Sequence, residues 1–237
     1  MSRPDIRSVA ETGSTNDDVM ALAREGAAEG LWLSADVQTT GRGRQGRDWT
    51  SPKGNLYTST LVRLKDGDPP PASLAMVAAI ALFDTALSYL PYGRFVLKWP
   101  NDLMLDGAKV SGILLEREGD AVVVGMGLNL ASHPTGLDRP VTSLAAHGGH
   151  IPPDIFIADL APQFARVLDH WRSNPLSATI AQWQGRAHAQ GTPLTVHDGG
   201  GDPVAGVFDG LNEDGALRLR LEDGEVRVIH AGDVFLV

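Results

Sequence analysis

A run of glycine and arginine residues between two predicted strands is the feature that most limits how this chain can fold. Residues 41–49 read Gly-Arg-Gly-Arg-Gln-Gly-Arg-Asp-Trp and match the G-x-G-x-x-G fingerprint of dinucleotide-binding folds. That fingerprint requires a helix to begin at the glycines. Here a turn-rich stretch, 49–55, and an alternating β-rich segment, 56–64, follow instead. The sequence therefore argues against a parallel βαβ nucleotide-binding unit and predicts a loop.

The charge of this loop indicates an anionic ligand. Arg42, Arg44 and Arg47 have no acid among them, in a chain whose formal net charge is -9. Guanidinium groups match the geometry of phosphate and carboxylate, and Gly41 and Gly43 let the backbone approach a ligand closely. We expect an ordered or orderable loop that closes over a nucleotide phosphate, with a solvated surface turn as the alternative.

The composition narrows the class of protein. The 237 residues, 43% of them apolar, allow one large domain with a small appendage. The absence of cysteine excludes disulfides and thiolate chemistry and fits a cytoplasmic enzyme. A pI near 5.1 argues against a protein that covers nucleic acid. No apolar run follows the charges near the N-terminus, so we expect no secretory signal. The apolar run 74–87 is too short to span a bilayer, so we expect no membrane partner.

Polar residues flank the loop on its N-terminal side. Ser14, Thr15 and Asn16 begin the predicted helix 16–24, where Ser or Thr suits the N-cap and the three also suit a small polar ligand. Gln38 ends the strand before the arginine loop and carries donors and an acceptor that suit an amide- or urea-like group. A plain helix cap and an exposed strand end are the alternatives.

A second dense stretch follows the predicted strand 95–99. The strand ends in a Pro-Asn-Asp turn bracketed by Lys98, and Asn101 with Asp102 would hold Mg²⁺ indirectly beside phosphates. An Asp-Gly hairpin then places Lys109 at the start of the next strand. Beside the arginine loop, Lys109 would stabilise a reacting carboxylate or phosphate; a solvent-facing lysine is the alternative.

The later segments complete the predicted layout. Gly125 and Gly127 are two residues apart in a predicted strand and share a face, which Asn129 continues; a ligand or a second backbone would lie flat against it. Helices are predicted over 72–90, 152–172 and 176–184. From about residue 191, short strands alternate with Gly-rich and Asp-rich turns, 198–201 among them, as in a small antiparallel barrel. We expect two domains, 1–187 and 188–237.

Five motifs, in order, resemble those of the biotin protein ligase family, in its single-function form without a DNA-binding domain. They are Gly13-Ser14-Thr15-Asn16, Gln38 with 41–49, Lys98-Trp99-Pro100-Asn101-Asp102-Leu103, Lys109-Val110-Ser111-Gly112-Ile113-Leu114 and Gly125-Met126-Gly127-Leu128-Asn129. The resemblance covers nearly the whole chain. It implies an α+β fold, with a mixed, mainly antiparallel sheet flanked by helices as in class II aminoacyl-tRNA synthetases, and a small C-terminal SH3-like β-barrel.

The resemblance also implies an activity. Biotin and ATP, with Mg²⁺, would give biotinyl-5′-AMP and pyrophosphate, and a lysine of a biotin carboxyl carrier domain of a carboxylase would then displace AMP. No operator DNA is expected as a partner, and a homodimer is left open.

Site residues follow from the family pattern. Ser14, Thr15 and Gln38 would face the ureido ring of biotin, with Asn16 beside them. The biotin and nucleotide contacts would be completed by Gly41, Arg42, Gly43, Arg44, Arg47, Trp49, Lys98, Asn101, Lys109, Gly112, Gly125, Gly127 and Asn129. Lys109, Arg44 and Asp102 would be catalytic, and Asp102 is also the candidate metal ligand and the nearest candidate base for the incoming lysine.

Two other functions compete with this interpretation. A lipoate or octanoate ligase shares the acyl-adenylate chemistry, but we expect it to lack the arginine loop and the Lys-Trp-Pro-Asn-Asp turn. A non-enzymatic RNA-binding module would use the loop arginines and Trp49 for phosphates and stacking, and its binding would weaken steeply with salt.

Overall fold

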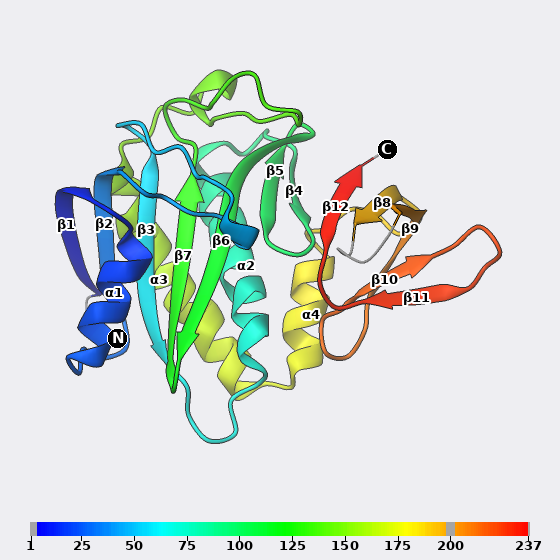
Figure 1. Ribbon diagram of the computed structural model, residues 1–237, viewed down its shortest axis with the longest axis horizontal. Helices are drawn as coiled ribbons and strands as arrows, with labels where there is room; N and C mark the ends of the chain where they lie inside the picture. Colours follow the sequence, from blue (N-terminus) through cyan, green and yellow to red (C-terminus); the bar gives the residue numbers. More distant parts are fainter. Residues whose placement is uncertain (1–3, 198–201, 237) are drawn as a thin grey trace.

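The computed structural model describes residues 4–197 and 202–236 and contains two β-sheets (Figure 1). The larger sheet has the strand order β1-β2-β3-β7-β6-β5-β4. Its strands are β1 (Asp5–Thr12), β2 (Leu31–Gln38), β3 (Leu56–Arg63), β4 (Phe95–Lys98), β5 (Asp102–Leu105), β6 (Ala108–Glu118) and β7 (Ala121–Leu128). Only β1 and β2 pair in parallel in this sheet. The predicted mixed, mainly antiparallel sheet is confirmed.

Helices cover both faces of this sheet (Figure 1). They are α1 (Thr15–Arg24), α2 (Leu74–Tyr89), α3 (Pro153–Ser173) and α4 (Leu176–Gln184), with short 3-10 turns η1 (Arg44–Gly46), η2 (Pro71–Ser73) and η3 (Ala145–His147). Strand alternation divides the core: Val123 of β7 packs with α1, whereas its neighbours Val122 and Val124 join the core beneath the other helices. Helix α1 covers only part of its face of the sheet. Beyond the N-terminus of α1 this face carries polar residues, and the site lies there.

Helix α2 is apolar on nearly every side because the protein surrounds it. With its leading turn this helix spans Pro71–Tyr89, which by length and composition alone could cross a membrane. However, 61% of its most apolar stretch is buried inside the protein. It contacts four strands of the sheet as well as α3 and α4. This helix is the centre of the main core, as its sequence predicted.

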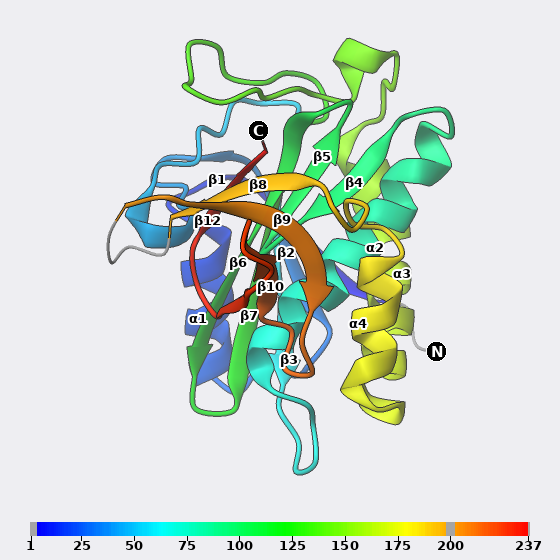
Figure 2. The same ribbon diagram turned by 90° about the vertical axis from the view of Figure 1, so that its right-hand side faces the viewer.

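The second sheet is antiparallel, in the order β11-β10-β9-β8-β12. Its strands are β8 (Pro193–His197), β9 (Val204–Leu211), β10 (Leu217–Arg220), β11 (Val226–Ile229) and β12 (Asp233–Leu236). The turn predicted at 198–201 lies outside the described residues. Figure 2 shows this sheet in front of the first one, and apolar side chains of both belong to one continuous core. The indole of Trp99 donates to the carbonyl of Gly215, 3.1 Å away.

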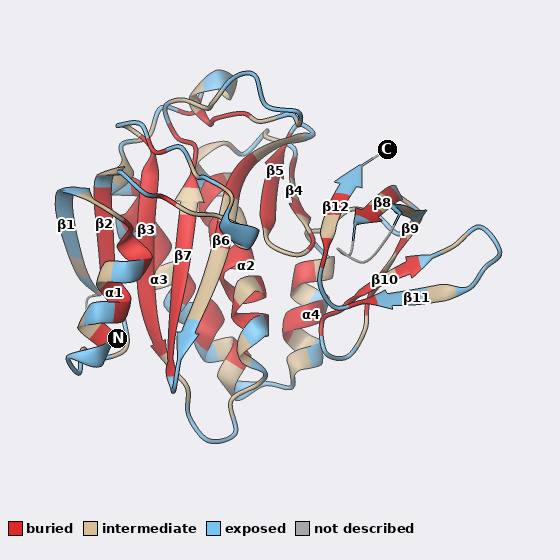
Figure 3. Cartoon of the chain, in the orientation of Figure 1, coloured by how far each residue is buried: buried red, intermediate tan, exposed pale blue. Residues whose placement is uncertain are grey.

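Burial separates the framework from the polar face. Figure 3 shows the central strands β3 and β7 as buried, whereas β1 and the turn η1 are largely exposed. The arginine loop that contains η1 therefore covers the sheet from outside, as a segment that a ligand can reach.

Candidate active site

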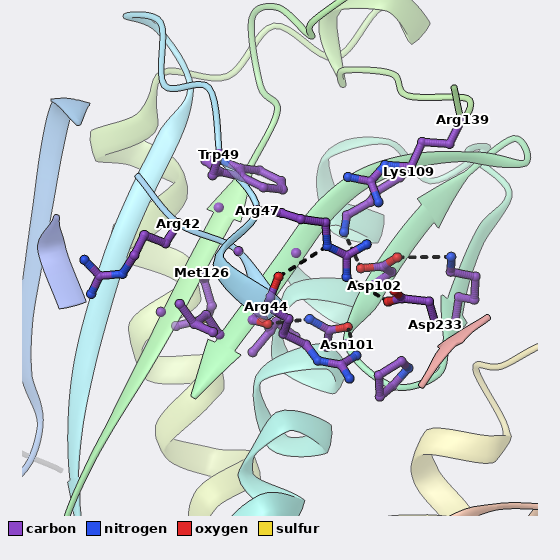
Figure 4. A pocket seen from close by; sticks show the side chains of 18 of the residues that line it. Arg42, Arg44, Arg47, Trp49, Asn101, Asp102, Lys109, Met126, Arg139 and Asp233 are labelled. Atoms are coloured by element: carbon purple, nitrogen blue, oxygen red, sulfur yellow. Dashed lines mark hydrogen bonds and ion pairs between the residues drawn. The ribbon is translucent and has the colours of Figure 1, made fainter. Parts of the chain in front are cut away.

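A cavity of about 300 Å³ opens between the arginine loop, strands β6 and β7, and strand β12 of the second sheet (Figure 4). It brings together most of the residues singled out from the sequence. The ones that line it are Ser14, Thr15, Asn16, Gln38, Arg42, Gly43, Arg44, Arg47, Trp49, Lys98, Asn101, Asp102, Lys109, Gly112, Gly125 and Gly127.

Two of the predicted residues lie outside the cavity and have packing roles. A Cβ at Gly41 would lie 2.6 Å from the carbonyl oxygen of Trp49, so glycine is needed there to close the loop on itself. Asn129 follows the end of β7 rather than continuing its face, and its buried amide donates to the carbonyl of Thr142 at 2.9 Å. In this structure Asn129 therefore holds a neighbouring segment in place.

A hydrogen-bonded network forms one end of the cavity. The backbone N–H of Thr15 donates to Gln38 Oε1 at 2.9 Å, and its hydroxyl lies 2.7 Å from that of Ser59. Ser59 in turn donates to Asn16 Oδ1 at 2.6 Å. Ser14 occupies the N-cap position of α1 without making a side-chain cap bond, and no hydrogen bond of its hydroxyl to a described residue is recorded. This end offers rigid polar groups and one free hydroxyl to a small ligand.

Arg42 is turned away from the other cations of the loop (Figure 4). Its guanidinium donates to both carboxylate oxygens of Asp17, at 2.7 and 2.6 Å, and to Glu116 at 3.3 Å. The hydrogen bonds with Asp17 raise the pKa of Arg42 and lower that of Asp17. In this conformation Arg42 ties the loop to α1 and β6, whereas the sequence predicted that it binds the ligand.

Arg44 and Arg47 tie the loop to the second sheet. Arg44 donates to Asn101 Oδ1 at 3.2 Å and to the carbonyl of Gly232 at 3.4 Å. Arg47 forms an ion pair of 2.7 Å with Asp233. The loop is thus held in order across the cavity mouth by residues far away in the sequence.

A buried carboxylate with two ammonium groups lies at the other end. Asp102 contacts Lys109 through one oxygen and Lys98 through the other, the latter at 3.1 Å. The pairing depends on a one-residue shift in register between Leu103 and Met104 of β5, opposite β6. In a regular strand, residues three apart such as Lys109 and Gly112 lie on opposite faces. The shift in register brings the side chain of Lys109 onto the same face as Gly112.

The charges of this group fix its chemistry. Burial by itself would raise the pKa of Asp102, but Lys109 and Lys98 together hold it below its ordinary value. Burial also lowers the pKa of Lys109, despite its attraction to Asp102. Asp102 is therefore a carboxylate that stays ionised, which makes it a weak base.

Asp102 does not fit the role of a metal ligand. Both of its oxygens are engaged by ammonium groups, and a dication would have to displace them against their charge. No cluster of three or more His, Asp or Glu side chains suited to a metal occurs within residues 4–197 and 202–236. The metal assignment made from the sequence is not supported by this geometry.

Trp49 lies on a platform of two paired glycines. Gly112 of β6 and Gly127 of β7 are direct cross-strand partners. A Cβ at Gly127 would approach the indole to 2.5 Å, and one at Gly112 would approach it to 3.1 Å. The indole is 5.7 Å from Lys109 Nζ, and its N–H is buried without a partner among the described residues. The two glycines thus contact the indole ring of Trp49 directly. A ligand in the cavity would lie against that ring and not against the glycines.

Replacing Gly127 by alanine is expected to displace this ring. Overpacking of this kind costs about 1–3 kcal/mol, so the free energy of unfolding should fall by that amount in urea titrations. Gly185→Ala is the matched control, because its Cβ would meet nothing closer than 3.5 Å. A Gly127→Ala protein as stable as the control would show that the ring moves freely.

The structure adds residues that sequence analysis missed. From the first sheet and its loops they include Tyr57 and Met126, and from the second sheet Asp233, Val234, Phe235 and Leu236. Arg139 also lines the cavity, from the irregular segment between β7 and η3. No local pattern could have marked these residues, because their positions depend on how the two sheets meet and how a long loop folds back.

Comparison with known proteins agrees with this geometry. Residues 12–129 match the model of the biotin/lipoate A/B protein ligase family, and residues 191–237 match the biotin protein ligase C-terminal domain. The chain is 38% identical to the biotin–[acetyl-CoA-carboxylase] ligase of Paracoccus denitrificans, over 96% of this chain and 98% of that protein. The chain belongs to the biotin protein ligase family. The Mycobacterium tuberculosis ligase is 36% identical, over 95% of this chain and 86% of its own length.

Solved structures of biotin protein ligases share the whole fold. The Aquifex aeolicus enzyme in complex with biotin and ATP superposes with a TM-score of 0.86 at 25% identity, covering 98% of this chain and 99% of its own. The Leishmania major enzyme in complex with biotinyl-5-AMP gives a TM-score of 0.70 at 25% identity, with 97% and 100% coverage. The agreement over the full length confirms the predicted α+β fold with its C-terminal domain.

Proposed function

We propose that this protein is an ATP-dependent biotin protein ligase, which forms biotinyl-5′-AMP and transfers biotin to a lysine of a biotin carboxyl carrier domain. The observation that carries the proposal is the cavity itself. It has a hydrogen-bonded polar end at Thr15 and Gln38 and a cationic end at Lys109, joined under an arginine loop. Family membership supports the same conclusion.

Biotin would bind with its ureido ring at the polar end. Such a ring carries N–H donors and a carbonyl acceptor, which need partners once they are buried. The free hydroxyl of Ser14 and the side chains of Asn16 and Gln38 supply polar atoms at that end. The carboxylate of biotin would then extend toward Arg44 and Lys109.

The first step joins two anions, and the cations of the cavity oppose their repulsion. One oxygen of the biotin carboxylate attacks the α-phosphorus of ATP, the bond to the bridging oxygen breaks, and pyrophosphate leaves. Lys109 would neutralise charge on the reacting oxygens, held in place by Asp102. Arg44 and Arg47, already ordered against the second sheet, would hold the phosphates without the cost of ordering a free loop.

The second step forms an amide. The acceptor amine attacks the acyl carbon, the bond to AMP breaks, and the amine loses a proton. We assign no base to this step, because Asp102 is engaged by two ammonium groups. Mg²⁺ enters the proposal only as the counter-ion of the triphosphate, with no protein ligand assigned. A cytoplasmic location and the absence of a DNA partner, suggested by the missing cysteines and the acidic charge, complete the proposal.

Intact-mass analysis of a biotin carboxyl carrier domain tests the proposed function. Incubation with the protein, biotin, ATP and Mg²⁺ should add the mass of one biotin, and omission of ATP should abolish the gain. A gain with lipoate but not with biotin would assign the protein to lipoate chemistry, and no gain with either acid would contradict the proposal.

A further inference from the structure

Arg139 is a cavity-lining cation without an assigned role. Figure 4 shows its side chain beside Lys109. Among the described residues, its buried Nε has no hydrogen-bond partner and its guanidinium forms no ion pair, although Asp138 precedes it. A buried N–H donor left without a partner lacks compensation for the loss of its hydration.

The charge around Arg139 indicates a missing anion. Among the described residues that line the cavity, six are cationic and four are acidic: Arg42, Arg44, Arg47, Lys98, Lys109 and Arg139 against Asp48, Asp102, Asp138 and Asp233. Asp102 already forms ion pairs with two lysines, and Asp233 forms one with Arg47. Arg139 also adds its repulsion to the burial that lowers the pKa of Lys109. An anion between the two cations would relieve this repulsion.

The segment that carries Arg139 is fastened to the strand that carries Lys109. The backbone N–H of Lys109 donates to the carbonyl of Pro140 at 3.0 Å, and its carbonyl accepts from Thr142 at 2.9 Å. Asn129 holds the same segment through the carbonyl of Thr142. Arg139 is thus placed next to Lys109 by the main chain.

A chain of three side chains fastens the segment a second time. Thr142 Oγ1 lies 2.9 Å from His147 Nε2, and His147 Nδ1 lies 3.0 Å from Asp106 Oδ2. Asp106 forms the tip of the β5–β6 hairpin, with φ of 50°, and its other oxygen accepts from Arg94 at 2.5 Å. These contacts join the segment to the hairpin that bears both Asp102 and Lys109. Arg139 and Lys109 therefore keep a fixed separation.

We propose that Arg139 binds the phosphate chain of ATP beside Lys109, and that His147 positions it through Thr142 and Asp106. This inference rests on the proposed function. The ligand at Arg139 is an oxyanion, which either the triphosphate or the biotin carboxylate could supply. The triphosphate fits better, because Arg44 and Arg139 both lack an acidic partner among the described residues, and a single carboxylate would leave one of them uncompensated.

Steady-state kinetics of Arg139→Gln test the first part. A lost guanidinium–phosphate contact should raise KM for ATP by about 10- to 100-fold, with KM for biotin changed less than twofold. Inhibition by added pyrophosphate should weaken in parallel. Arg166→Gln is the matched control, since Arg166 lies on the exposed side of α3 and its guanidinium donates, among the described residues, to Gln163.

Each outcome decides the assignment. An unchanged KM for ATP, or a rise confined to KM for biotin, would overturn it. Arg139→Lys keeps the charge and should recover part of the affinity, which separates loss of binding from loss of folding. If the wild-type protein shows no biotin-dependent turnover, the proposed function itself is refuted. If it turns over and Arg139→Gln has no effect, only the role of Arg139 is refuted.

A double-mutant cycle tests the role of His147. His147→Ala should raise KM for ATP by about 3- to 10-fold and should add little when Arg139 is already glutamine, because coupled residues are not additive. Effects that multiply fully in the double variant would show that His147 acts elsewhere. His147→Gln, which can still hydrogen-bond, should restore part of the affinity; failure to do so would count against a positioning role.

Discussion

Replacing Lys109 by methionine is expected to slow biotin-dependent adenylation by about 10²–10³-fold, the usual effect of removing one preorganised group that stabilises transition-state charge. Lys109 lies at the cationic end of the cavity with its side chain only 13% exposed, so water cannot substitute for it. The rate is measured as ATP–pyrophosphate exchange at saturating ligands.

The control for this prediction is Lys98→Met. Lys98 is buried to a similar degree and shares Asp102, but its ammonium also donates to the carbonyl of Val234 in the second sheet, at 2.9 Å. If Lys109 acts on the ligand, its variant should be the slower of the two. Equal rates would contradict the prediction, because Lys109 would then contribute no more to the reaction than Lys98.

Replacing Asp102 by asparagine is expected to lower the free energy of unfolding by about 3–5 kcal/mol, as measured in urea. Removing one member of a buried ion pair leaves the partner charge uncompensated, and here two ammonium groups would be left. Asp102→Asn combined with Lys109→Met removes one of these charges and should recover part of the loss. A single variant as stable as the wild type would contradict the prediction.

The same residue should leave a signature in acid. Lys109 and Lys98 hold the pKa of Asp102 below its ordinary value in the folded protein, whereas the unfolded chain has the ordinary value. Its contribution to stability is therefore complete above that value and is lost as the pH falls through the lower folded pKa. Below about pH 4 the stability of the wild type should fall more steeply than that of Asp102→Asn.

The sequence by itself determined the elements and much of the site. Alternation of side chains marked β3, apolar composition marked α2, and turn residues marked the β5–β6 hairpin and the turn before β7. These signals are local, because they follow from backbone geometry and from which face of an element must be buried. The pairing of Gly125 and Gly127 on one face was readable for the same reason.

Only the tertiary structure decided which charges meet. Arg47 pairs with Asp233, 186 positions away. Arg42 pairs with Asp17 and Glu116, partners that its motif did not indicate. Lys109 reaches Asp102 only through a shift in strand register.

Arg139 and Asn129 were decided in the same way. A folded-back segment brings Arg139 to the cavity and gives the amide of Asn129 a backbone partner. Composition and spacing indicate what kind of group a residue can bind. Its actual partner depends on long-range packing, because each buried charge and polar group needs a partner among the groups that the fold places next to it.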